Sequence, residues 1–353
     1  MNLNDTQAFQ VLDKQNMLSH IDGLPDQMRQ AWDLGSNLPL PPGYQVQQIV
    51  IAGMGGSAIG GDLLAAYIAP SCRVPVVVHR DYGLPAWAYG PQTLVIASSH
   101  SGNTEETLDA FAQAQARNCR LLAITTGGAL ARQAEVGGIP IWRFDHKGQP
   151  RAAVGYSFCL LLAALARLDL IPDPAAELED AISAMRAQQL QLKADVTDVH
   201  NPAKRLAGQL VGRLVTVIGS DVLTPVARRW KGQINELAKA WGSYDTLPEA
   251  DHNSLAGSHN PPESLSKVMA LFLRAASDHP RNRKRADLTR KILMLNGVGT
   301  DHFTARGETR LAHLWTALHF GDYMGYYLAM AYEVDPTPVD AIESFKIALN
   351  DQG

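Results

Sequence analysis

The sequence has few cysteines. Cys72, Cys119 and Cys159 are the three present in 353 residues, and no two of them form a CxxC pair. An odd number of widely spaced thiols builds neither a disulfide framework nor a structural zinc site, so both classes are excluded. We expect these side chains to be buried in the core of a cytoplasmic protein, where thiols stay reduced.

The sequence also lacks an excess of basic charge. It has 31 Lys and Arg residues against 35 Asp and Glu residues, which gives a formal net charge of -4. Nucleic-acid-binding domains usually carry a basic excess, so no nucleic-acid partner is expected. Hydrophobic residues make up 46% and charged residues 19% of the chain, and this balance excludes disorder over most of its length.

No apolar run is long enough to cross a membrane. The most apolar uncharged stretch covers residues 152–166, whereas a spanning helix needs about 20 residues. The longer uncharged run over 34–61 is broken by Pro and Gly residues. The N-terminus carries Asp5 and Asp13 where a secretion signal would need a basic start and an apolar stretch. We therefore predict a buried helix over 152–166, no membrane partner and a cytoplasmic location.

The sequence does contain a series of short apolar runs, separated by helical or turn-rich stretches. In the first half these runs cover residues 48–53, 75–78, 93–97, 121–125 and 139–142. This alternation predicts an α/β fold with a doubly wound, mostly parallel sheet flanked by helices. Ligands of such sheets bind at the carboxyl ends of the strands.

The run at 214–219 (LVTVIG) repeats the pattern of 48–53 (QIVIAG) about half a chain later, and a Gly-Ser turn and a helical pattern follow each run. We therefore expect two α/β domains of the same architecture. The predicted division is N-terminal helices plus a first domain over 1–170, a helical connector over 171–203, and a second domain with C-terminal helices over 204–353. Within the second domain the expected helices cover 264–277, 290–295 and about 308–333, and a last helix follows the DPTP segment.

The segment Gly53–Ser57 (GMGGS) lies between a predicted strand and a predicted helix. Glycines let the backbone approach an anion closely, the start of the helix offers free N–H groups, and Ser57 adds a hydroxyl, so the segment predicts an anion site. With Ala58 it also matches the G-x-G-x-x-A pattern of dinucleotide-binding loops. A nicotinamide-dependent enzyme is therefore an alternative, although Asp81 lies further along the chain than the usual acidic partner at about 20 residues.

A second polar loop, Ser98–Glu106 (SSHSGNTEE), follows the third predicted strand. Its hydroxyl and N–H groups, combined with those of the first loop, suit the three oxygens of a terminal phosphate, whereas a pyrophosphate held mainly by backbone does not need them. The alternative is that Ser101, Asn103 and Thr104 only cap the following helix. Because both loops belong to one sheet, we favour a phosphate monoester.

Further motifs follow these two loops along the chain. The full set is GMGGSAIGGD (53–62), SSHSGNTEET (98–107), PRAAVGYS (150–157), WKGQINELAK (230–239), EADHNSLAG (249–257) and DPTPVDAIESFK (335–346). In order and spacing they resemble the motifs of the bifunctional phosphoglucose/phosphomannose isomerase family, which is built from two sugar isomerase (SIS) domains. The resemblance covers most of the chain.

The resemblance implies an isomerase that interconverts glucose 6-phosphate, and mannose 6-phosphate, with fructose 6-phosphate through a cis-enediol. It implies that the phosphate is held by Gly56, Ser57, Ser99, Ser101 and Thr104. It further assigns Glu236 as the base, Arg151 as the cation that stabilises the enediolate, and His252 and Lys346 as the pair that opens the sugar ring. In the family this histidine reaches the neighbouring subunit, so a homodimer is expected, and the chemistry needs no metal or cofactor.

Three positions depart from the family pattern. They are His100, where relatives commonly have Tyr, Leu237, where Asn often follows the base, and Ser254, where Glu usually follows the histidine motif. The departures leave open an inactive SIS-domain protein that binds sugar phosphates as a regulator. The alternative for the proposed base is that Glu236 has no catalytic role and is a surface residue paired with Lys231 or Lys239.

Overall fold

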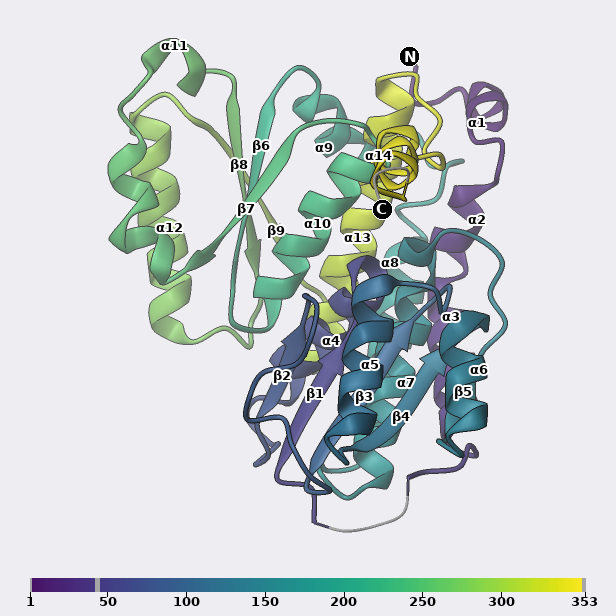
Figure 1. The fold of residues 1–353 in the computed structure, drawn as a ribbon. Helices are drawn as coiled ribbons and strands as arrows, with labels where there is room; N and C mark the ends of the chain where they lie inside the picture. The colour runs from purple at the N-terminus through teal and green to yellow at the C-terminus, as the bar shows by residue number, and fades with distance from the viewer. Residues whose placement is uncertain (1, 42–44, 351–353) are drawn as a thin grey trace.

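The computed structural model describes residues 2–41 and 45–350, and its first part is a five-stranded sheet (Figure 1). The strand order is β2-β1-β3-β4-β5, and every neighbouring pair is parallel. The strands are β1 (Gln48–Ala52), β2 (Val76–His79), β3 (Thr93–Ser99), β4 (Arg120–Thr125) and β5 (Ile141–Arg143). All five predicted strands are present, and the doubly wound α/β class is confirmed.

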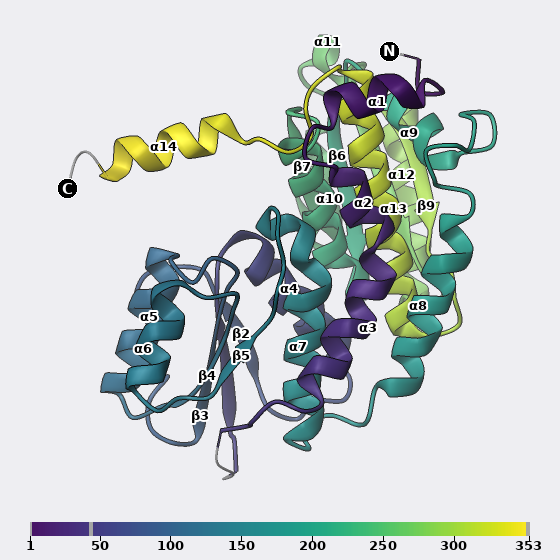
Figure 2. The ribbon, with the colours of Figure 1, turned by 90° about the vertical axis from the view of Figure 1, so that its right-hand side faces the viewer.

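Helices cover both faces of this sheet. Figure 2 shows α4 (Gly55–Ile68) and α7 (Val154–Arg167) on one face, with α5 (Glu105–Ala116) and α6 (Gly128–Val136) on the other. Because both faces are covered, β3 and β4 are buried along their whole length. That burial explains why they appear in the sequence as continuous apolar runs rather than as alternating patterns.

The second part contains a four-stranded parallel sheet of order β7-β6-β8-β9. Its strands are β6 (Leu214–Ser220), β7 (Gly242–Leu247), β8 (Val268–Arg274) and β9 (Gly299–Thr304). The predicted repeat of the strand at 214–219 is confirmed. Two helices lie on opposite faces of the sheet, α10 (Thr224–Glu236) toward the centre of the molecule and α12 (Pro280–Leu295) on the outside (Figure 1).

The helix expected over 264–277 is wrong, because most of that segment is β8 and only α11 (Pro262–Leu265) is helical. The five central residues of β8 are buried. A strand buried on both faces shows no alternation, so periodicity cannot distinguish it from a buried helix. The helix expected over 290–295 is the last part of α12.

A layer of buried helices joins the two sheets. It is formed by α3 (Leu24–Gly35), α7, α8 (Ala175–Gln189), α9 (Pro202–Leu210) and α13 (Arg310–Ala331). Helix α7 is buried from Val154 to Leu165 and α13 from Leu311 to Met330, which confirms both predicted helices. Packing here requires glycine at one point, since a Cβ on Gly321 would lie 2.0 Å from the Trp230 Nε1 atom. Within residues 2–41 and 45–350, no helix combines the length and apolarity needed to cross a bilayer.

The remaining helices are short. They are α1 (Thr6–Leu12), α2 (Met17–Asp22), η1 (Pro150–Ala153), η2 (Asp221–Leu223), η3 (Glu249–His252) and η4 (Ser254–Gly257). Of the three thiols, Cys159 is fully buried, whereas Cys72 and Cys119 lie in connections between helices and strands and are only partly buried. The predicted domain boundaries, which place a connector between residues 170 and 203, stay predictions.

The C-terminal helix α14 (Asp340–Asn350) leaves the body of the molecule, as Figure 2 shows. The expected helix after DPTP is therefore present. Its side chains from Asp340 to Leu349 are exposed, including those of Phe345 and Ile347. The segment just before it is anchored, because Pro336 and Thr337 are buried.

Candidate active site

The two polar loops follow β1 and β3, which are adjacent strands whose connections run to opposite sides of the sheet. This is the topological switch point, where open α/β sheets bind ligands. In the first loop, Gly55 has a φ of +50°, and a Cβ on Gly56 would lie 2.6 Å from the Pro150 carbonyl oxygen. Glycine at Gly56 therefore lets the segment that carries Arg151 lie directly against the start of α4.

One hydrogen bond joins the two loops, and a second pairs two hydroxyls of the second loop. The His100 N–H donates to Ser57 Oγ over 3.2 Å, and Ser99 Oγ lies 2.9 Å from Thr104 Oγ1. Ser57 and Ser99 are buried, whereas Ser101 is exposed at the rim, where its Oγ accepts from the Asn103 N–H. These groups, with the free N–H groups at the start of α4, form a polar cradle at the switch point of the sheet.

The capping alternative explains this loop poorly. Thr104 is the N-cap residue of α5, but its side chain makes no capping hydrogen bond. Asn103 Oδ1 instead accepts from the Ala129 N–H at the start of α6. The hydroxyls of Ser99 and Thr104 therefore face each other rather than the helix end.

Arg151 lies beside the cradle and is only 4% exposed. Its Nη1 is 3.4 Å from Glu236 Oε2, and its Nη2 donates to the carbonyl oxygens of Pro336, at 2.8 Å, and Thr337. Its Nε is buried and has no hydrogen-bond partner among the described residues. Burial lowers the pKa of Arg151, and the charge of Glu236 opposes this effect. The guanidinium is thus fixed in place and keeps a donor unused.

Glu236 is the last residue of α10, and its side chain is 37% exposed toward the cleft. It pairs with Arg151 and not with a lysine of its own helix. Lys239 instead donates from Nζ to the Glu236 carbonyl oxygen over 2.6 Å. Partial desolvation of the Lys239 amine, together with the nearby charge of Arg151, lowers its pKa to about 8. The structural interpretation of Glu236 as a lysine-paired surface residue is therefore not supported.

A buried ion pair that sequence reasoning missed fixes the orientation of α10. Arg229 donates from Nε and Nη2 to the two carboxylate oxygens of Asp322 at 3.1 and 2.9 Å, and Gln233 donates to the same carboxylate at 2.8 Å. Arg229 Nη2 also donates to the Arg151 carbonyl oxygen. The available signal was Asp322 itself, since a carboxylate inside an apolar helix needs a buried partner.

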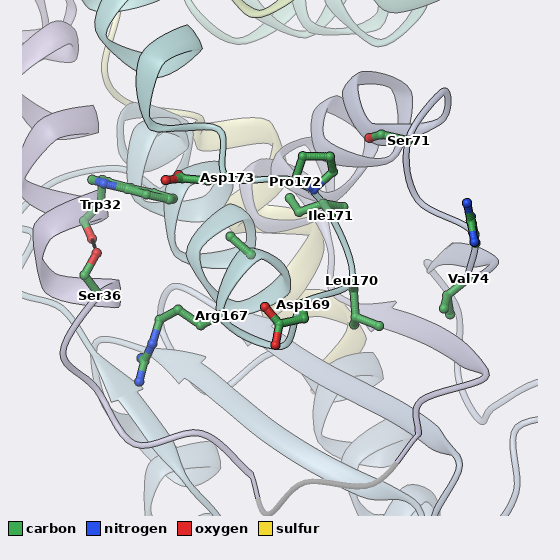
Figure 3. A pocket seen from close by; sticks show the side chains of 12 residues that line it. Trp32, Ser36, Ser71, Val74, Arg167, Asp169, Leu170, Ile171, Pro172 and Asp173 are labelled. Carbon is green, nitrogen blue, oxygen red and sulfur yellow. Dashed lines mark hydrogen bonds between the residues drawn. The ribbon is translucent and has the colours of Figure 1, made fainter.

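A cleft of about 350 Å³ lies between the first glycine loop and α10. Its lining combines the loop, five cations, one carboxylate and one aromatic ring: Met54, Gly55, Gly56, Ile59, Arg80, Arg151, Arg228, Arg229, Lys231, Gly232, Gln233, Glu236 and Tyr244. A larger cavity of about 730 Å³ opens at the amino ends of the first sheet, next to Trp32, Arg167 and Asp169 (Figure 3). It contains none of the predicted site residues, so the cleft is the candidate active site.

Of the predicted residues, Gly56, Arg151 and Glu236 line this cleft, and the four hydroxyl residues lie in the neighbouring loops outside its lining. His252 and Lys346 lie away from it within one chain. His252 is exposed at the end of η3, which follows the carboxyl end of β7, whereas Glu236 precedes the amino end of β7. A six-residue strand spans roughly 17–20 Å, so these side chains lie at opposite ends of the second sheet. Lys346 is exposed on α14 and makes no contact with the cleft.

The departures from the family pattern have local explanations in two cases. Leu237 is fully buried in the main core next to α13. Ser254 donates to the carboxylate of Asp245 on β7. Neither side chain lines the cleft.

His100, the third departure, belongs to a cluster of imidazoles beside the cradle. Its Nε2 lies 3.0 Å from His146 Nδ1, and the His146 ring centroid is 5.2 Å from that of His20. Burial lowers the pKa of all three, and neighbouring imidazoles help to lower that of His146 to about 4. The described residues include no group of three or more His, Cys, Asp or Glu side chains suited to a metal ion.

The histidine cluster should make the protein lose stability in acid. A histidine whose pKa is lowered in the fold binds fewer protons than the unfolded chain. The stability linked to it is therefore full above about pH 6.5 and falls as the pH drops toward about 4. We expect His146→Gln to reduce this acid loss by about 1–2 kcal/mol, allowing for the partial exposure of the ring. Urea unfolding at about pH 7 and about pH 4.5 measures the effect.

The matched control is His259→Gln, which removes an exposed imidazole outside the cluster. It should lose stability with falling pH as the unmodified protein does. Equal pH dependence of His146→Gln and the unmodified protein would show that the cluster does not titrate with folding.

Comparison with known proteins agrees with this arrangement. Residues 44–139 match the SIS domain family, and residues 199–349 match the bacterial phospho-glucose isomerase C-terminal SIS domain. A solved structure of a hypothetical protein from Thermus thermophilus has the same fold with a TM-score of 0.75. It is 17% identical and the match covers 98% of this chain and 94% of that one.

Two relatives match most of the sequence at higher identity. A bifunctional phosphoglucose/phosphomannose isomerase of Caldicellulosiruptor bescii is 38% identical over 332 residues, which are 94% of this chain and 98% of the relative. A protein of the same name from Aquifex aeolicus is 34% identical over 84% of this chain and 89% of its own. The chain therefore belongs to the bifunctional phosphoglucose/phosphomannose isomerase family.

Proposed function

We propose that the protein interconverts glucose 6-phosphate and mannose 6-phosphate with fructose 6-phosphate. The observation that carries the proposal is the pairing of a fixed, buried arginine with an accessible carboxylate, Arg151 and Glu236, beside a hydroxyl-lined phosphate cradle. In the proposed complex the phosphate binds to the N–H and hydroxyl groups of Gly56, Ser57, Ser99, Ser101 and Thr104. The C1–C2 edge of the open sugar then faces Glu236.

The proposed reaction is a proton transfer through an enediolate. The Glu236 carboxylate removes the proton from C2 of the aldose and returns it to C1, while the aldehyde oxygen gains the proton that the C2 hydroxyl loses. Negative charge on the enediolate oxygens is stabilised by Arg151, whose unused Nε donor and low exposure make its charge effective. Because C2 is planar in the enediol, protonation on either face accounts for both aldose epimers.

Ring opening needs an acid and a base near the ring oxygen and the C1 hydroxyl. We assign these roles to His252 and Lys346. The separation of His252 from Glu236 by the length of β7 supports a homodimer in which the histidine serves the site of the second copy. For Lys346, support comes from the anchored start of its segment, because Arg151 holds the carbonyl groups of Pro336 and Thr337 just before α14.

The direct test is a coupled assay on the purified protein. Fructose 6-phosphate should be converted to glucose 6-phosphate, and mannose 6-phosphate to fructose 6-phosphate, without added metal or nicotinamide. Tight binding of these sugar phosphates with no turnover would instead support the regulator alternative. Binding of a nicotinamide dinucleotide in place of sugar phosphates would support the third alternative.

A further inference from the structure

The cleft extends beyond Arg151 and Glu236 to a second group of cations, Arg80, Arg228 and Lys231. Arg80 follows the edge strand β2, and the other two lie on α10, where they are neighbours at helical spacing. None of the three is among the residues that the family resemblance assigns to phosphate binding or catalysis. The isomerisation of a singly phosphorylated sugar therefore does not explain why three cations lie in this part of the cleft.

These three cations are only partly neutralised, because the group shares one carboxylate. Arg80 Nη2 and Arg228 Nη1 both bind one oxygen, Oδ2 of Asp62. Arg80 Nη1, Arg228 Nη2 and Lys231 Nζ make no hydrogen bond to any residue in the described ranges. The remaining cations of the cleft are matched, Arg151 with Glu236 and Arg229 with Asp322. Five cations against three carboxylates leave a charge of +2, and it is concentrated at Arg80, Arg228 and Lys231.

The strand order sets the distance from the phosphate cradle to this group. Along the carboxyl edge of the first sheet, β3 ends at Ser99, the start of α4 with Gly56 follows β1, and Arg80 follows β2. One strand spacing, about 5 Å, therefore separates Arg80 from the part of the cradle that follows β1, and two spacings, about 10 Å, separate it from the part that follows β3. A hexose lying across the middle strand would place its phosphate at one end and its C1 end toward the three cations.

We propose that Arg80, Arg228 and Lys231 form a second anion subsite, which binds the second phosphate of a hexose 1,6-bisphosphate. The inference rests on the proposed function, because the cradle must hold the 6-phosphate for the C1 end to reach this subsite. Arginine forks and a lysine ammonium suit a phosphate, and charge-assisted hydrogen bonds to it are strong. An aldose 1-phosphate cannot open its ring, since the anomeric oxygen is esterified. Such a ligand occupies the cleft without being converted and inhibits the isomerase competitively.

The test is calorimetric titration of the complete protein with glucose 1,6-bisphosphate and with fructose 6-phosphate. The bisphosphate should bind at least about tenfold more tightly than the monophosphate, since it adds charged hydrogen bonds. Arg228→Gln and Lys231→Gln should each weaken bisphosphate binding about tenfold and change monophosphate binding less than about threefold. Lys291→Gln, which removes an exposed lysine from α12, is the matched control and should change neither.

The outcomes separate this inference from the proposed function. Equal affinity for the two ligands, or equal effects of the variants on both, would overturn the subsite whether or not the protein is an isomerase. Selective bisphosphate binding that Arg228→Gln weakens would support the subsite even if turnover were absent, because calorimetry needs no reaction. If the protein is active, inhibition of fructose 6-phosphate conversion by the bisphosphate should be competitive and should weaken in the same two variants.

Discussion

Glu236→Gln is expected to lower the turnover of fructose 6-phosphate by roughly 10³-fold, because it removes the group that transfers the proton between C1 and C2. The amide keeps the shape of the side chain at the end of α10, and the phosphate cradle lies on other elements. Binding of the sugar phosphate should therefore be largely preserved, so the loss should appear in kcat rather than in KM. Steady-state kinetics and calorimetric titration of the variant measure the two quantities.

The control for charge removal is Glu135→Gln. Glu135 is exposed and pairs with Arg143 on the surface, away from the cleft, so this variant should retain the original kcat. A thermal melt should show that both variants remain folded. Turnover of Glu236→Gln within about threefold of the unmodified protein would remove Glu236 as the base and leave the cleft without an assigned proton acceptor.

Most of the first sheet was predictable because its strands are short and bounded by polar turns, and because the central strands β3 and β4 are fully buried. The runs at 93–97 and 121–125 are β3 and β4 to within two residues. The second sheet was less predictable. Burial of its strand β8 on both faces removes the alternation that identifies a half-buried strand. Sequence reasoning therefore placed a helix where the chain crosses the middle of the sheet.

The candidate site was also only partly predictable from the sequence. The polar loops at 53–57 and 98–104 were found because glycine and hydroxyl residues between a strand and a helix have a physical meaning in sequence alone. The cations Arg80 and Arg228 were not found, since they are far apart in the chain and meet only because β2 lies next to β1 and α4 lies against α10. Glu236 lies before the amino end of β7 and His252 lies after its carboxyl end. This separation is also evident only in the fold.

That placement of Glu236 and His252 leads to a prediction about mixed dimers. Glu236→Gln and His252→Ala should each be nearly inactive as homodimers, the second by roughly 10²-fold or more, since each lacks one acid–base group. A hybrid dimer of the two chains contains one site with both groups intact. In that site Glu236 comes from the His252→Ala chain and the histidine from the Glu236→Gln chain. The other site of the hybrid lacks both groups.

Coexpression of the two chains with different tags allows the hybrid to be purified. It should recover about half of the activity of the unmodified dimer, because one of its two symmetry-related sites is complete. A hybrid of Glu236→Gln with Arg151→Lys is the matched control. Glu236 and Arg151 meet within one chain, so neither site of that hybrid is complete and no activity should return. Recovery in neither hybrid, or a monomer by light scattering, would show that His252 does not act across an interface. In that case the separation along β7 would exclude it from ring opening at the Glu236 site altogether.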